Sequence, residues 1–164
     1  MSYQVKRTIT SLFAGLLFLA AYCLFAIQKA LSGTVNPGDL KFWASAMLVF
    51  IAVGIVAQIV VQILFHLIFS IGIAIERQES DKKAIDRSIK ASMVEDEMDQ
   101  AISLKSARIG YYIAGAGFIA ALVTLVAGLP AEAALHVMFI GFFGAATASN
   151  LSQLIMYRRS LPHE

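Results

Sequence analysis

The chain has little charge and almost no cysteine, and each shortage excludes a class of protein. Its 164 residues include one cysteine, Cys23, so no disulfide can form within the chain. This excludes the four-helix membrane disulfide oxidases, which need several thiols. Charged residues make up 15% of the chain, whereas soluble domains carry about 25%. The net charge of +2 gives no reason to expect nucleic acid as a partner.

Acidic residues are missing from all the long apolar runs. This absence excludes aspartyl signal peptidases and the glutamate-dependent four-helix drug exporters, and no nucleophile–base pair is visible either. His66 and His136 lie in different runs, and we expect their depths in a membrane to differ by ~18 Å. They therefore cannot share one haem iron. We expect a protein without a catalytic site, metal or cofactor.

Hydrophobic residues fill most of the chain. They make up 59% of it, and the mean hydropathy is +0.74. A helix of about 20 apolar residues crosses the ~30 Å hydrocarbon layer of a bilayer. Four uncharged runs are long enough, at 8–28, 42–75, 109–131 and 133–157. The sequence therefore predicts an all-α membrane protein, with residues 1–164 forming a single domain of four transmembrane helices in a lipid bilayer.

The first run resembles a signal peptide because Lys6 and Arg7 precede it. The run is longer than the apolar region of about 7–15 residues in such peptides, so we expect a permanent span. Basic residues predict the orientation. All of the 13 Lys and Arg residues except Lys29 and Lys41 lie in the N-terminal arm, the 76–108 linker or the C-terminus. Both termini and the linker should therefore be cytoplasmic.

The 76–108 linker is expected to form a cytoplasmic helical hairpin extension between spans two and three. Basic and acidic residues are nearly balanced in it, and Ile85, Ile89 and Met93 recur at helical spacing. Ser92 and Glu95 fit a capping box, which places the start of the third helix near Ser92. Similarly, Asn36 is the expected N-cap of span two.

Span three carries small residues at a period close to 3.5. Small residues allow helix backbones to approach closely, which drives helix association in lipid. Span four continues the pattern, so we expect spans three and four to pack as a tight hairpin. The predicted packing residues are Gly110, Ala114, Gly117, Ala121 and Gly128.

Span two carries a polar ladder at a spacing of four residues. Gln58, Gln62 and His66 are its polar members. Span four has Asn150 and Gln153 in its cytoplasmic half, at a depth where they could meet His66. These five residues are the candidate polar intramembrane cluster. Two interpretations stay open: hydrogen bonds that fix helix packing, or a small-molecule or proton site.

The second half of the chain carries an acidic patch, a K-x-x-R step, paired tyrosines and a Y-R-R end, formed by Asp96, Glu97, Asp99, Lys105, Arg108, Tyr111, Tyr112, Tyr157, Arg158 and Arg159. In these elements it resembles a group of small four-span bacterial inner-membrane proteins. The resemblance implies a multi-pass protein of the bacterial inner (cytoplasmic) membrane and implies no chemistry.

Together these features favour a non-catalytic membrane scaffold or accessory subunit, assembled as a homo-oligomer or with a larger membrane-protein partner. The alternative is a small transporter or channel with a polar path between spans two and four around His66.

Overall fold

The described part of the chain is a bundle of four long helices. The computed structural model describes residues 3–36, 38–77 and 96–160. The helices are α1 (Tyr3–Leu31), α2 (Leu40–Arg77), α4 (Glu97–Val126) and α5 (Ala131–Ser160). All four are long and apolar enough to cross a membrane. Helices suit these sequences because lipid offers no hydrogen-bond partner, so each backbone N–H and C=O must be satisfied within its own segment.

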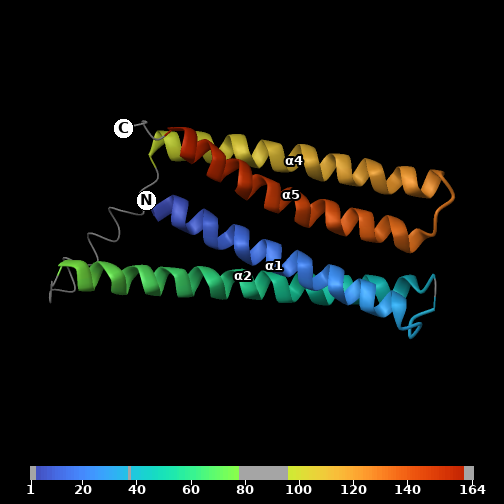
Figure 1. Ribbon diagram of the computed structural model, residues 1–164. Coiled ribbons are helices and arrows are strands. Elements are labelled where there is room, and N and C mark those ends of the chain that lie inside the picture. Colours follow the sequence, from blue (N-terminus) through green and yellow to red (C-terminus); the bar gives the residue numbers. More distant parts are fainter. Residues whose placement is uncertain (1–2, 37, 78–95, 161–164) are drawn as a thin grey trace.

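The helices lie side by side in the order α4, α5, α1, α2 (Figure 1). The α4–α5 pair has the most extensive contact, α1 packs on α5, and α2 packs mainly on α1 and touches α5. At one end of the bundle, here called the terminal end, α1 begins and α5 stops (Figure 1). At the other, the hairpin end, lie the connections 32–39 and 127–130. As a result, α2 and α4 form opposite edges of the bundle.

The helix starts differ from the two predicted caps. Phe42 donates its backbone N–H to the Asp39 carboxylate at 3.0 Å, so Asp39 takes the capping role expected of Asn36. The N-cap of α4 is Asp96, which forms a capping box with Asp99. Ser92 and most of the predicted cytoplasmic hairpin lie outside the described residues. Its two ends are described, and they continue α2 to Arg77 and begin α4 at Glu97.

The turn between α4 and α5 is set by Gly128. This residue has a φ of 76°, which favours glycine. Its N–H donates to Leu125 O, and the N–H of Leu129 donates to Thr124 O at 3.0 Å. These two bonds form a Schellman motif, which satisfies the last carbonyls of α4. Gly128 thus ends the helix, and a side chain there would meet no other atom within 4 Å.

The buried side chains form two clusters at opposite ends of the bundle. At the terminal end, Val5, Ile102 and Tyr157 join α1, α4 and α5. Towards the hairpin end, a second cluster consists of Tyr22, Met47 and Phe139. Between them the outer faces are apolar and exposed. In α2, Trp43 and Met47 are the only buried residues among the described side chains.

Candidate functional site

The polar ladder of α2 faces α1. Gln58 Nε2 donates to Ser11 Oγ at 2.8 Å. One turn further along, Arg7 Nε donates to Gln62 Oε1 at 3.2 Å. The next turn of each helix brings His66 and Tyr3 to the same cavity. The two helices are antiparallel, so a four-residue spacing on one matches a four-residue spacing on the other. We call this contact the α1–α2 seam.

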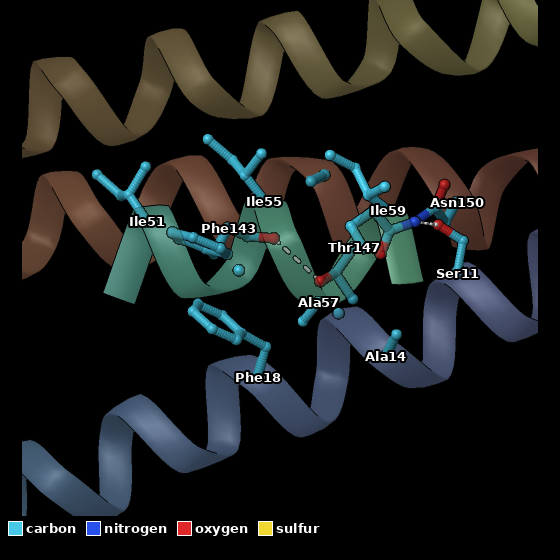
Figure 2. Close-up of a pocket in the computed structure, with 14 residues that line it drawn as sticks. Ser11, Ala14, Phe18, Ile51, Ile55, Ala57, Ile59, Phe143, Thr147 and Asn150 are labelled. Carbon is cyan, nitrogen blue, oxygen red and sulfur yellow. Dashed lines mark hydrogen bonds between the residues drawn. The ribbon is translucent and has the colours of Figure 1, made fainter. Parts of the chain in front are cut away.

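A cavity of about 500 Å³ lies between α1, α2 and α5. Figure 2 shows Ser11 and Asn150 at one end of it, and Phe18, Phe143 and Ile51 towards the other. The rings of Phe18 and Phe143 stack at 5.1 Å between centroids. The central cavity, as we name it, therefore has one polar end and one apolar end.

Polar groups at the central cavity come from all three helices. The Gln58–Ser11 bond is one polar contact there. A second is the hydrogen bond that the Thr147 hydroxyl donates to the backbone oxygen of Phe143 at 2.9 Å (Figure 2). Phe143 lies four residues earlier in α5, which is the usual position for a threonine hydroxyl to bond within a helix. Gly54 lines this cavity too, and a Cβ there would lie 2.9 Å from the Phe18 ring. The absence of a side chain at this position gives the Phe18 ring its place against α2.

A second cavity, of about 410 Å³, lies on the α1–α2 seam at the terminal end. It is lined by Tyr3, Arg7, Gln62, Ile63, His66 and Leu67. We call it the seam pocket. Tyr3 is 8% exposed and is held by two rings of α2, with centroid distances of 5.4 Å to Phe65 and 4.8 Å to Phe69.

The structure thus divides the five residues of the candidate cluster. Gln58 and Asn150 line the central cavity, whereas Gln62 and His66 line the seam pocket. Gln153 is half-buried on α5 and lines neither cavity. Whether these groups fix helix packing or bind a solute stays a prediction. What the geometry adds is a continuous polar stripe along α2 with α1 as its neighbour.

The small residues of α4 face α5. A Cβ on Gly117 would lie 2.9 Å from Gly141 Cα, and one on Gly141 would lie 3.0 Å from Gly117 Cα. At Gly110 a Cβ would meet Ser149 Cβ at 3.2 Å. Gly110 and Ala121 are buried, Ala114 is half-buried beside them, and Gly128 belongs to the turn. The backbones of α4 and α5 are therefore in contact at Gly117 and Gly141.

Sequence reasoning missed a hydrogen bond towards the hairpin end. The Tyr22 hydroxyl and His136 Nδ1 are 2.7 Å apart, and Tyr22 is fully buried. The Trp43 ring meets the His136 ring edge-on, with centroids 4.5 Å apart. The distance of each residue along the chain from its hairpin connection could have indicated this cluster, because residues at similar distances from one end lie at similar depth in the bundle. Tyr22, Trp43 and His136 are aromatic residues with polar groups, each within a few turns of that end.

The acidic side chains whose contacts are described accept hydrogen bonds from backbone N–H groups. Asp96 and Asp99 cap α4, and Glu132 accepts a hydrogen bond from the Gly38 N–H at 3.0 Å, which ties the two hairpin connections together. Within residues 3–36, 38–77 and 96–160, no three His, Cys, Asp or Glu side chains are grouped as a metal site would need.

No family model, curated protein or solved structure matches the chain.

Proposed function

We propose that the protein is a non-catalytic membrane scaffold or accessory subunit that acts by helix–helix assembly. The observation that carries the proposal is an apolar trough on one face of the bundle. Its floor is α5, and its walls are α2 and α4. The basic residues around the termini and the resemblance of the second half support a bacterial inner membrane with both termini in the cytoplasm.

The trough consists of two hollows that share the α5 residues Phe142 and Ala146. The hollow between α2 and α5 has a volume of about 550 Å³, and Ala44, Leu48 and Met138 are among its lining residues. The hollow between α4 and α5 has a volume of about 270 Å³ and is lined by Ala107, Gly110, Tyr111, Ala114, Phe142, Ala145, Ala146 and Ser149. Many of these are small, as at contacts between transmembrane helices.

The occupant that we propose is a second copy of this chain. Each copy offers a concave trough and, beside it, an exposed apolar helix, α2, of 38 residues. In a twofold dimer the two troughs face each other, and α2 of each copy lies against α5 of the other. Such an interface is isologous and closes on itself. Van der Waals contact with the small residues would hold it together, since lipid gives no hydrophobic drive for association.

The mass of the protein extracted in a mild detergent tests this arrangement. We expect a dimer for the wild type and a monomer for Ala146→Phe, because the added ring fills the floor that both hollows share. Ala120→Phe is the matched control, since Ala120 is exposed on α4 and lies outside the trough, and it should stay dimeric. A wild-type monomer would overturn self-association, and a complex with another membrane protein would assign the trough to a different occupant.

A small transporter or channel is the second candidate. It is favoured by the continuity of the α1–α2 seam, where the central cavity ends at Gln58 and the seam pocket begins one turn later at Gln62. A solute path would run from Asn150 along these side chains to His66. Solute flux into proteoliposomes separates the candidates. Specific flux that is lost in His66→Leu supports the transporter and contradicts a purely structural role.

A further inference from the structure

The seam pocket combines a cation, several hydrogen-bonding groups and an apolar edge. Arg7 supplies the guanidinium, and Gln62, His66 and Tyr3 supply an amide, an imidazole and a phenol. Ile63 and Leu67 of α2 form the apolar edge and are 55% and 52% exposed. None of the described lining residues is acidic. The pocket therefore has the composition of a site for an anion that carries an apolar group.

On α1, α4 and α5 the seam pocket lies level with the basic end of an apolar run, whereas the uncharged run of α2 continues past His66 to Ile75. Arg7 immediately precedes the apolar run 8–28. Val5, beside it on α1, packs against Ile102 and Tyr157, so the pocket lies level with the basic residues Lys105 and Arg158 near those positions. Lys and Arg gather where a transmembrane helix leaves the hydrocarbon, which is the depth of the lipid phosphates.

Arg7 is oriented towards α2 by a defined contact. The hydrogen bond from its Nε to Gln62 Oε1 fixes the guanidinium against that helix. Its planar fork of N–H donors matches the oxygens of a phosphate better than an ammonium does. Lys6, the preceding residue, has a different environment. Its Nζ lies 5.8 Å from the centre of the Phe69 ring, and it does not line the pocket.

We propose that the seam pocket binds the phosphate group of a membrane phospholipid. Arg7 holds the phosphate by charge, and Gln62, His66 and Tyr3 hydrogen-bond to the headgroup. An acyl chain follows Ile63 and Leu67 along the outer face of α2. The apolar edge is what favours a lipid over free phosphate, because inorganic phosphate has nothing to bury there. The seam pocket shares no lining residue with the trough.

The experiment measures lipid retention by the full chain. Purified, delipidated protein in detergent is incubated with phosphatidylglycerol, and bound lipids are counted by native mass spectrometry. We expect Arg7→Gln to weaken retention by about tenfold or more, the effect of losing a hydrogen-bonded charge. Lys6→Gln removes the same charge one residue away and should change retention less than about twofold, since Lys6 does not line the pocket and an exposed charge without a direct contact acts weakly. Equal losses in both variants would show non-specific attraction and overturn the proposal.

Two further arms identify the source of the phosphate and guard against misfolding. Diacylglycerol, which has the acyl chains without the phosphate, should bind the wild type and Arg7→Gln alike. Inorganic phosphate at millimolar concentration should not displace phosphatidylglycerol, and displacement would assign the pocket to free phosphate. Arg7→Lys keeps the charge and should retain an intermediate amount of lipid. If Arg7→Gln fails to fold, His66→Leu provides the second loss of a headgroup contact. Retention that is unchanged both in His66→Leu and in Arg7→Lys would refute the site.

Discussion

The contact between Gly117 and Gly141 gives the sharpest test of the α4–α5 pair. In Gly117→Ala the new methyl group would lie 2.9 Å from Gly141 Cα, whereas ordinary van der Waals contact begins near 3.4 Å. The obstacle is backbone, so no side-chain rotation can relieve it and the helices must separate. Excess volume in a packed core costs about 1–3 kcal/mol. A gap of 0.5–1 Å along the rest of the interface also removes about a quarter to a half of the attraction there.

Gly115→Ala is the matched control on the same helix. A side chain at Gly115 would meet nothing within 4 Å. Both variants gain the same preference of alanine over glycine within a helix, about 0.8–1.0 kcal/mol. The difference between them therefore isolates the steric cost, and we expect Gly117→Ala to be less stable than Gly115→Ala by about 1–3 kcal/mol.

Unfolding by increasing sodium dodecyl sulfate in mixed micelles, followed by far-ultraviolet circular dichroism, gives the two free energies. Unfolding midpoints that coincide, or a higher midpoint for Gly117→Ala, would refute the reasoning that these backbones are in contact.

Two other predictions concern the hairpin end and use the same unfolding measurement. Tyr22→Phe should lower the free energy of unfolding by about 0.6–1.7 kcal/mol, the range for hydrogen bonds between transmembrane helices, because it removes the bond to His136 Nδ1. In a double-mutant cycle with His136→Phe the two changes should be coupled, and strict additivity would show that the bond contributes nothing. Gly128→Ala should cost about 1–2 kcal/mol, since its φ of 76° forces an L-residue into the left-handed region. An unchanged free energy would mean that the turn adopts another conformation without loss.

The four helices could be predicted from the sequence because each apolar run is far longer than a chance fluctuation. The α4–α5 contact could be predicted too, since small residues at a period near 3.5 define one face and the short connection leaves one obvious neighbour. These features depend on local pattern and chain length, which the sequence states directly. Gly128 was predicted as a packing residue, whereas in the structure its φ of 76° places it in the turn that ends α4.

The neighbour of the α2 ladder was harder to predict. A four-residue spacing defines a stripe on one helix but does not say which helix it faces. The complementary stripe was present on α1, where Tyr3, Arg7 and Ser11 have the same spacing and run in the opposite direction. The apolar run that predicts this helix begins at residue 8, so Tyr3 and Arg7 lie before it and its pattern does not include them. In the structure α1 begins at Tyr3, which makes both residues part of the helix.

The two helices of the α4–α5 hairpin and the two helices of the α1–α2 hairpin are held together by different kinds of contact. This difference has a consequence for motion. Between α4 and α5 the glycine backbones touch, so any separation breaks many contacts at once and the pair moves as one body. Between α1 and α2 the contact consists of separate ring contacts and of two hydrogen bonds spaced one turn apart, with cavities beside them. Such bonds can exchange partners one at a time as a helix slides or tilts. When lipid thickness or a bound neighbour changes, we therefore expect α2 to adjust its tilt while the α4–α5 pair keeps its shape, so the bundle combines a fixed frame with one movable edge.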